Sequence, residues 1–592
     1  MALLRARGAT RLTSSATAVF APRTHVAAAE SPATLRSSLG IGIAAALVLT
    51  LASTLGINPY QFGVGDNSIT LPIMHSYMDP RLYPGDFMVG QKVYYYTLLW
   101  QALAALRAHV DVSSHTLFLS VYLVALFATL MAVYLLAIRL FRSERAGVIA
   151  VTFMLFRRPT LAGIDTVESV LNTRHVATPL VLFALLLFLE RRTVWSFVLL
   201  GLGYLIHPLT VHPVLAMLIV AAMIDPARRR ALAVGVAAFA LLAAPILAWK
   251  LAHTPPSLHL FAADPRWLQA LHLRSPHHMF PSSWGVNAAV HAMLVVGLLA
   301  VSWWFWTPVR RDDRRVLAAW VATLLVVCVA GVWFAEVTPI GAAFLLQPIR
   351  SFQFLEYLVI LGVANLVVDA CTRAQPVPGF FTAIVAGLAL VITAPGAMRP
   401  FALFLIMLAF VAWDRFAARP LGRRGFAIAA CALVALTGAW QAAERRGDWS
   451  EFSATNAQDA SWLDVQSWAR EHTDVRDAFI VPPGLYDEFR VRSQRTVYAD
   501  WEDGGLMNSN PAFGIEWLRR MRALGYAGKG DPETKFRPLR SDEIRNIAAE
   551  MRPENPRVFF VAPRMEGSRG FPVRYLNPAY LVAEVVPPTG AR

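Results

Sequence analysis

The feature that most constrains this chain is a series of long apolar runs separated by short connectors that contain arginine. A helix needs about 20 mostly apolar residues to cross the hydrocarbon core of a bilayer. Of the 592 residues, 56% are hydrophobic and 16% are charged, whereas soluble proteins carry roughly 25% charged residues. The sequence therefore predicts an all-α polytopic membrane bundle.

The arginines also predict how the runs thread through the membrane. Cytoplasmic loops of membrane proteins are enriched in Lys and Arg, and Arg11, Arg23 and Arg36 precede the first run. We therefore expect the N-terminus inside, the C-terminus outside and about 13 transmembrane helices. Some of these spans are short and must tilt or be shielded by their neighbours. The expected spans are 38–57, 115–138, 146–160, 176–189, 194–208, 212–224, 231–250, 287–307, 316–335, 345–369, 379–395, 400–416 and 425–441.

Composition divides the chain into three parts. Residues 1–37 are rich in Arg, Ser, Thr and Ala, and we expect a disordered, basic cytoplasmic tail. Residues 38–441 form the predicted transmembrane domain, with long outer loops at 58–114 and 251–285. Residues 442–592 are charged and alternate strand-like segments (DAFIVP, RTVYAD, RVFFVAP, YLVAEVV) with helix-like ones (DASWLDVQSWAREHT, PAFGIEWLRRMRALGY). This last part is predicted to be an extracytoplasmic α/β domain.

Charge and motif content exclude several classes of function. The net charge of +15 arises from small clusters between apolar runs; this is a signal of topology, so no nucleic-acid partner is expected. The 3 cysteines make no disulfide framework. The absence of GxxxxGK[ST], GxSxG, HExxH and CxxC motifs disfavours nucleotide hydrolysis, serine hydrolase chemistry and structural zinc. Energy for a reaction would have to arrive with an activated donor.

Ionisable residues gather on the predicted outer side of the membrane. Because such groups are costly at membrane depth, their accumulation on one side indicates a water-filled cavity there. The ordinary polarity of loops is an alternative that explains the 251–285 loop, but it explains charged residues at span ends less well. The candidate substrate-binding residues are His75, Asp79, Asp86, Arg174, His175, His207, His212 and Arg350.

Asp66, in the segment GVGDNS, is the candidate catalytic residue. It lies just before SITLPIMHSYM, where apolar residues recur at helical spacing. A carboxylate held there can act as a general base toward a hydroxyl acceptor or as a metal ligand. A structural alternative is that Asp66 or Ser68 caps the helix. Asp79 and Asp86, beside prolines, fit Asx turns as well as they fit function.

Three basic residues fit phosphate recognition. His207 and His212 belong to HPLTVHP, at the tip of a predicted tight turn, where an imidazole can contact a phosphate oxygen. Two histidines that merely end helices are the alternative. Arg350, in FLLQPIRSFQFLEYL, lies near the outer end of a span and can pair bidentately with a lipid-linked phosphate. Snorkelling to lipid headgroups is the alternative for Arg350.

The early acidic outer loop, the multi-span bundle and the outer α/β tail resemble the GT-C superfamily of membrane glycosyltransferases. That superfamily includes oligosaccharyltransferase catalytic subunits, protein O-mannosyltransferases and lipid A aminoarabinose transferases. GVGDNSITLPIMHSYMDPRLYPGDFM, HPLTVHP and DEFRVRSQRTVYADWEDGG resemble a bacterial branch of it. The resemblance spans most of residues 38–592. It implies sugar transfer from a polyprenyl-phosphate-linked donor on the outer face, with Asp66 as base or metal ligand and Arg350 or His207 as phosphate contacts.

Two functions remain open on the sequence. One is a glycosyltransferase acting on a cell-envelope acceptor; the other is a non-catalytic transporter or assembly subunit for envelope polysaccharide or lipid-linked glycan. A divalent cation also stays open, although Asp66 is followed by Asn67 where many superfamily members carry a second acid. The expected partners are membrane lipid and the lipid-linked sugar, and the oligomeric state is left open. The composition favours a bacterial inner membrane, with the C-terminal domain in the periplasm.

Overall fold

The structure is a computed structural model that describes residues 32–155, 160–305, 311–372, 457–483, 489–528 and 536–586. Three expected spans, at 379–395, 400–416 and 425–441, lie outside the described residues. So do most of the expected N-terminal tail and residues 442–456.

Each expected span within the described residues coincides with a helix. These helices are α2 (Pro32–Ala52) with the π-helix η1 (Ser53–Ile57), α5 (Ser114–Phe141), α6 (Glu144–Leu155), α7 (Thr173–Leu189), α8 (Thr193–Ile206), α9 (Pro208–Ile224), α10 (Arg229–Ala252), α13 (Gly285–Phe305), α14 (Arg311–Val332) with the π-helix η5 (Trp333–Val337), and α16 (Phe352–Thr372). In the described part of the chain, 5 helices are long and apolar enough to cross a membrane. The chain is a multi-pass membrane protein, and the total of 13 spans and their orientation remain predictions.

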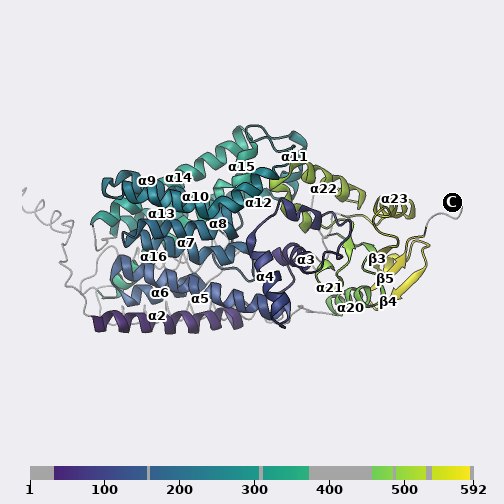
Figure 1. Cartoon of the computed structure of the whole chain (residues 1–592), viewed down its shortest axis with the longest axis horizontal. Helices are drawn as coiled ribbons and strands as arrows, with labels where there is room; N and C mark the ends of the chain where they lie inside the picture. The colour runs from purple at the N-terminus through teal and green to yellow at the C-terminus, as the bar shows by residue number, and fades with distance from the viewer. Residues whose placement is uncertain are drawn as a thin grey trace, which may run out of the picture.

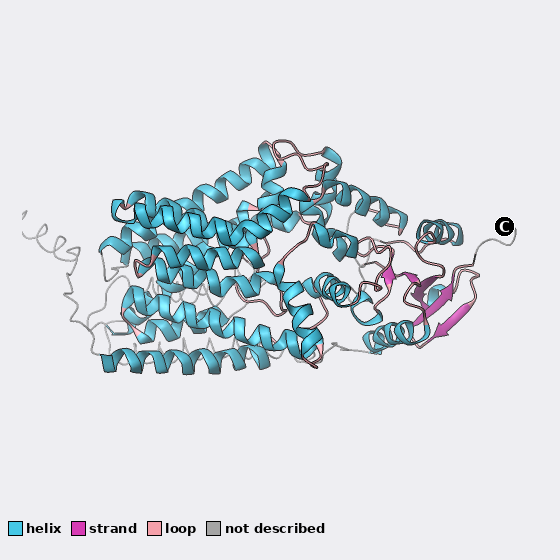
Figure 2. Cartoon of the chain, in the orientation of Figure 1, coloured by secondary structure: helices cyan, strands magenta, loops and turns pink. Residues whose placement is uncertain are grey.

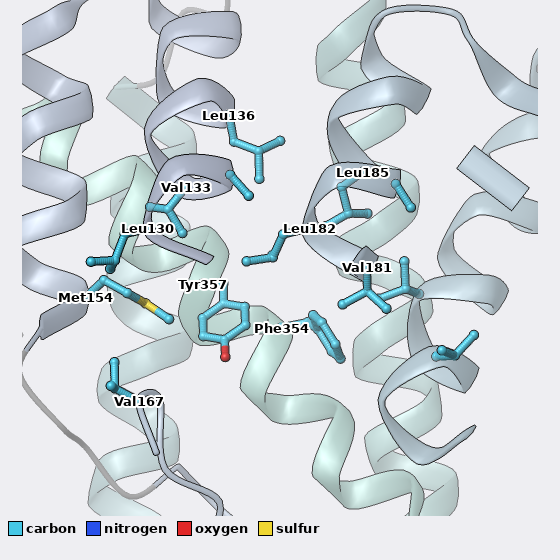
Figure 3. Close-up of a cluster of buried hydrophobic side chains, with 14 of the residues drawn as sticks. Leu130, Val133, Leu136, Met154, Val167, Val181, Leu182, Leu185, Phe354 and Tyr357 are labelled. Atoms are coloured by element: carbon cyan, nitrogen blue, oxygen red, sulfur yellow. The ribbon is translucent and has the colours of Figure 1, made fainter. Parts of the chain in front are cut away.

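Helix α16 lies at the centre of the bundle, in contact with α5, α6 and α13. Most of it is buried, whereas α2 and α10 leave most of their apolar residues exposed, as expected of helices that face lipid. Figure 3 shows the packing between these layers. Its labelled side chains are Phe354 and Tyr357 from α16, Leu130, Val133 and Leu136 from α5, Met154 from α6, Val167, and Val181, Leu182 and Leu185 from α7.

The expected span at 345–369 differs from one continuous helix. A short helix, α15 (Gly341–Leu346), ends at Gln347, and a 3-10 turn, η6 (Pro348–Ser351), leads into α16. Gln347 has a left-handed φ of 47°. Pro348 has no N–H and disfavours the helical conformation in the residue before it, so the helix breaks at this point. The break places Arg350 in a turn instead of inside a helix.

Ion pairs at one end of the bundle join residues that the sequence places in inner loops. Arg139 pairs with Asp313 at 2.8 Å, Arg191 with Asp312 at 2.7 Å, and Arg228 with Asp225 at 3.1 Å. Helix α7 runs from Arg174, near Asp66, to a C-terminus just before Arg191. Residues expected inside and outside therefore lie at opposite ends of the same helix, and the alternation of the spans stays a prediction.

The C-terminal part folds as a small α/β unit around a five-stranded sheet. The strands are β1 (Ala478–Ile480), β2 (Thr496–Val497), β3 (Val558–Pro563), β4 (Val573–Leu576) and β5 (Tyr580–Glu584), in the order β2-β1-β3-β5-β4. Strands β2, β1 and β3 are parallel, and β5 and β4 are antiparallel to their neighbours. Figure 2 shows all these strands at one end of the molecule. Strand β4 lacked a sequence signal because it is a mostly exposed edge strand with the mixed sequence VRYL.

The remaining described helices lie between or around these two parts. They are α3 (Asp66–Met78), η2 (Val89–Val93) and α4 (Leu98–His109) in the first loop; η3 (Pro226–Arg228); α11 (Pro265–Arg274), α12 (Pro276–Met279) and η4 (Pro281–Ser283) in the second long loop; and α20 (Ala457–His472), α21 (Phe489–Ser493), η7 (Glu502–Ser509), α22 (Pro511–Ala523), α23 (Ser541–Met551) and η9 (Arg564–Glu566) in the C-terminal part. The expected helices at 459–473 and 511–526 are thus present.

The two outer loops and the C-terminal part share one hydrophobic core, although the sequence suggested separate units. Ile73 and Met88 from the first loop and Trp267 from the second pack with Met507 and Trp517. In Figure 1 the loop helices α3, α4, α11 and α12 lie between the bundle and the C-terminal helices and strands. Burying these large side chains makes this end of the molecule a single packed unit.

Candidate active site

Asp66 is the first residue of α3, and Gly65, with a left-handed φ of 54°, occupies the cap position without a side chain. The expected capping role of Asp66 is therefore not observed. Its side chain is 51% exposed, accepts a hydrogen bond of 3.0 Å from the Asn172 amide and lies 3.9 Å from the Arg174 guanidinium. Its position leaves this carboxylate accessible at one end of the bundle while protein groups fix its direction.

Asn67, next to Asp66, is fully buried and serves as a structural tie. Its amide donates to the Leu171 carbonyl at 2.7 Å, and its oxygen accepts from the Gly63 N–H at 3.3 Å. Among the described residues, no group of 3 or more His, Cys, Asp or Glu side chains could hold a metal ion. The Asn67 side chain points away from the Asp66 carboxylate, and a guanidinium faces that carboxylate, so these residues do not fit a divalent cation.

The non-helical segment 160–172 places a further carboxylate, that of Glu168, near Asp66 through Arg174. It is held by hydrogen bonds from the Tyr122 hydroxyl to the Glu168 carbonyl at 2.9 Å and from the Gln61 N–H to the Ser169 carbonyl at 2.8 Å. Arg174 at the start of α7 then donates to the Glu168 carboxylate at 2.6 Å. Irregular backbone within a membrane protein is tolerated where protein surrounds it or where it lines a polar space.

Arg350, in the turn before α16, is a half-buried cation whose side chain has no ion pair among the residues that the structure describes. Its Nε is shielded from solvent and has no hydrogen-bond partner there. The charges of Arg174, Asp66 and Glu168 act on it. Because its side chain has no direct ion pair with a described residue, the guanidinium can bind an anion such as a phosphate.

Tyr95, at the end of the first loop, joins the same group. Its side chain lies near the side chain of Thr173. Burial, and next the charge of Asp66, raise the pKa of Tyr95 to about 12. The phenol therefore stays protonated at neutral pH and can donate a hydrogen bond.

His207 occupies the turn between α8 and α9, as the HPLTVHP pattern predicts. Its Nδ1 accepts a hydrogen bond from the Thr210 N–H at 3.2 Å and lies 2.7 Å from the Thr210 hydroxyl. A ring nitrogen that accepts from a backbone N–H carries no proton, so the neutral imidazole of His207 bears its proton on Nε2. The charges of Arg174 and Arg350 also act on His207. Asp66, Tyr95, Glu168, Arg174, His207 and Arg350 together form what we call the polar cluster.

The pair His277 and His278 in α12 lies beside the polar cluster. His278 Nδ1 donates to the Ala162 carbonyl at 2.6 Å, and the two rings lie 3.9 Å apart over Gly163. Burial lowers the pKa of His277 to about 4 and that of His278 well below its usual range, with Arg274 and Arg350 as further causes. Both rings are therefore neutral at pH 7 and can serve as hydrogen-bond donors or acceptors.

The other expected site residues lie elsewhere. His175 stacks on Tyr122 with ring centroids 4.6 Å apart and is packed inside the bundle, and His212 lies within α9, 3.3 Å from the Tyr204 hydroxyl. Asp79 accepts from the Arg81 N–H at 3.0 Å, which is the Asx turn that the sequence offered as an alternative. These contacts favour structural roles over the expected substrate-binding roles.

His75 and Asp86 face the C-terminal part. The Tyr83 hydroxyl donates to the Arg490 carbonyl at 3.0 Å and lies 3.2 Å from His75 Nδ1, while Arg490 Nε donates to Asp86 at 2.7 Å. Four of the expected residues, Asp66, Arg174, His207 and Arg350, thus meet in the polar cluster. Sequence reasoning missed Tyr95 and Glu168 because neither has a motif, although Glu168 lies in the expected outer segment.

Comparison with known proteins gives similarities of low sequence identity. Residues 460–524 match the family model "Domain of unknown function (DUF6798)". No curated protein matches the chain. The structure is similar to that of ArnT from Cupriavidus metallidurans in the apo state, with 13% identity, coverage of 93% of this chain and 98% of that chain, and a TM-score of 0.43.

It is also similar to the apo oligosaccharyltransferase of Archaeoglobus fulgidus, with 14% identity, coverage of 90% of this chain and 70% of that chain, and a TM-score of 0.42. ArnT bound to undecaprenyl phosphate gives 15% identity, coverage of 93% and 98%, and a TM-score of 0.36. These proteins are GT-C glycosyltransferases, the superfamily that the sequence resembles. At such identities and TM-scores, we carry no residue role from them to this chain.

Proposed function

We propose that the protein is a membrane glycosyltransferase that moves a sugar from a polyprenyl-phosphate-linked donor to a cell-envelope acceptor on the outer face of a bacterial inner membrane. The observation that carries this proposal is the half-buried guanidinium of Arg350, without an ion pair among the described residues and within electrostatic range of the accessible carboxylate of Asp66. The guanidinium can bind an anion, and the carboxylate can take a proton.

In the proposed reaction, Asp66 accepts the proton of the acceptor hydroxyl as its oxygen attacks the anomeric carbon of the donor sugar. The bond from that carbon to the phosphate oxygen breaks, and polyprenyl phosphate leaves with the bonding electrons. Arg350 and the Nε2–H of His207 stabilise the phosphate charge that develops. Arg174, already bonded to Glu168 at 2.6 Å, orients Asp66. A phosphate supplies the anion that Arg350 lacks.

Asp66→Asn tests the assignment of the base. It preserves the shape of the side chain and should reduce sugar transfer by about 100-fold or more, since general base catalysis contributes roughly 10²–10⁴-fold. The measurement is the envelope glycan profile of cells that lack the native protein and express the variant at matched levels. Asp111→Asn, in the same loop but fully exposed, is the control. Unchanged glycan output from Asp66→Asn would refute the base assignment.

A non-catalytic transporter or assembly subunit is the second candidate, because an anion bound by Arg350 need not react. The two functions differ in the lipid that co-purifies with the protein. In a transferase, Asp66→Asn should retain a sugar-bearing lipid that the native protein consumes, as judged by mass spectrometry of extracted lipids. A native protein that carries the same intact lipid as Asp66→Asn, with no turnover on addition of acceptor, would favour the second candidate.

A further inference from the structure

The segment from Asp66 to Tyr95 begins and ends in the polar cluster. Between these two points it packs against the C-terminal part. At its start, Asp66 accepts from Asn172 at 3.0 Å, and at its end, Tyr95 lies near Thr173, the residue after Asn172. Its middle, Tyr83 to Gln91, is packed against residues more than 400 positions later. Any shift of this middle part must therefore act on both ends.

Asp86 is the most strongly held residue of that middle part. Its Oδ1 accepts from the N–H groups of Met88 and Val89, each at 3.0 Å, and forms a local turn. Its Oδ2 accepts from Arg490 Nε at 2.7 Å and from the Val497 N–H at 3.0 Å. The two oxygens thus have separate tasks, one within the loop and one toward the C-terminal part.

Arg490 connects Asp86 to the interior of the C-terminal part. Its Nη1 donates to Asp503 at 2.8 Å, and its Nη2 donates to the same carboxylate at 3.0 Å. The side chains of Arg490, Asp86 and Asp503 are 5%, 0% and 2% exposed. Removing one member of a buried ion-pair group leaves a charge without its partner and is strongly destabilising.

Other contacts join the same two segments. The Thr496 hydroxyl donates to the Pro84 carbonyl at 3.0 Å, the Asn510 amide donates to Gln91 at 2.9 Å, and Phe513 stacks on Phe87 with ring centroids 4.3 Å apart. On the C-terminal side, the partners in all these contacts lie within residues 460–524. They are Arg490, Thr496, Val497, Asn510 and Phe513.

We propose that the segment 460–524 is a clamp that positions the first loop, with Arg490 as a positioning residue that acts through Asp86 on Asp66 and Tyr95. This inference rests on the proposed function for the role of Asp66. Helix α3 can transmit position because its two faces are held by different parts of the molecule. Leu71 and Met74 pack in the bundle core, and Ile69 and Ile73 pack in the core shared with the C-terminal part.

Asp86→Asn tests the clamp with little change of shape. The Asn oxygen can keep the turn at Met88 and Val89, but its NH2 group then faces the Arg490 and Val497 N–H donors. The Arg490–Asp503 pair stays intact, so the C-terminal sheet should remain folded. In the purified full-length protein in detergent, amide hydrogen exchange over residues 66–95 should accelerate by about tenfold or more. Exchange in β3 and β5 should not change.

Asp111→Asn is the control, because it makes the same chemical change at an exposed site of the first loop. Glycan output should fall at least fivefold in Asp86→Asn and stay unchanged in Asp111→Asn. The clamp is refuted if exchange over 66–95 is unchanged, if β3 and β5 lose protection together with it, or if glycan output persists although the loop is released. If Asp66→Asn keeps the glycan output of the native protein, the proposed function fails. The exchange data then still decide whether the first loop is clamped.

Discussion

At position 67, next to the candidate base, the side chain is an amide that is engaged in its own hydrogen bonds. Asn67 is consumed by bonds to Leu171 and Gly63, so its side chain fixes the backbone that presents Asp66. From the sequence alone, Asn67 is notable only because many members of the superfamily carry a second acidic residue at this point. The guanidinium of Arg174 lies 3.9 Å from the Asp66 carboxylate, close enough to orient it and to balance part of its charge.

His75 gives a prediction for the dependence of stability on pH. Burial, and next the charges of Arg470 and Arg107, lower its pKa to about 4 from 6.5. Below pH 6.5 the unfolded chain gains a proton that the folded protein refuses until about pH 4. The stability contributed by neutral His75 is therefore complete above pH 6.5 and is lost as the pH falls toward 4, by roughly 3 kcal/mol.

The measurement is the thermal unfolding midpoint of the detergent-solubilised protein at pH 7.5 and pH 5. The native protein should lose more stability on acidification than His75→Gln, because the variant lacks the titrating ring. His109→Gln, at the exposed end of α4, should behave like the native protein. Equal acid sensitivity of the native protein and His75→Gln would contradict the assignment.

At the scale of elements, the polar cluster depends on interruptions of regular helix. Gln347, with its left-handed backbone, and the following Pro348 place Arg350 in a turn before α16. His207 caps α9. The segment 160–172 has irregular backbone instead of helix. The break at Pro348 also needs space. A Cβ added to Gly331 of α14 would lie 2.9 Å from the backbone nitrogen of Ile349.

Gly331→Ala should therefore displace the turn that carries Arg350. We expect a lower unfolding midpoint and a loss of glycan output of at least fivefold, although the substitution touches no residue of the polar cluster. Gly297→Ala in α13 is the matched control, because nothing lies within 4 Å of its added Cβ. It should leave output unchanged and stabilise the helix by about 0.5–1 kcal/mol. Equal behaviour of the two variants in glycan profiling would rule out a constraint on the turn.

At the scale of the whole molecule, the two long loops and the C-terminal part form one body at one end of the bundle (Figure 1). Trp267 is central to this body. It is 1% exposed, its indole N–H donates to the Met507 carbonyl at 3.0 Å, and its ring meets Phe344 edge-on. The second loop is thereby fixed to the C-terminal part as firmly as the first.

Trp267→Ala should destabilise this body by roughly 3–5 kcal/mol, the usual cost of removing a buried Trp side chain. The unfolding midpoint should fall, and limited proteolysis should cut the 251–285 loop sooner than in the native protein. Trp195→Ala, in which a 62% exposed ring of α8 is removed, should show neither effect. A Trp267→Ala protein with native midpoint and cleavage rate would show that the loops and the C-terminal part are independent.

Most of the local elements could be predicted from sequence patterns. Apolar runs predict the helices of the bundle because hydrocarbon-exposed backbone must form its own hydrogen bonds, and β1, β3, β5, α20 and α22 carry clear periodic patterns. Asp66, His207 and Arg350 stood out because ionisable residues near apolar spans are costly and thus informative. Local patterns did not reveal the edge strand β4 or the break in the last described span, since neither has a sustained period.

Which polar residues lie near one another depends on long-range packing. Asp66 and Arg350 are 284 positions apart, the difference between 350 and 66, and the fold places them within electrostatic range of each other. The packing of the first loop on the C-terminal part makes Asp86, a candidate substrate-binding residue, the partner of Arg490, which lies 404 residues away. A carboxylate in a loop has the same local pattern whether it faces a substrate or a buried arginine. Its role depends on the long-range neighbour, and one sequence does not specify that neighbour.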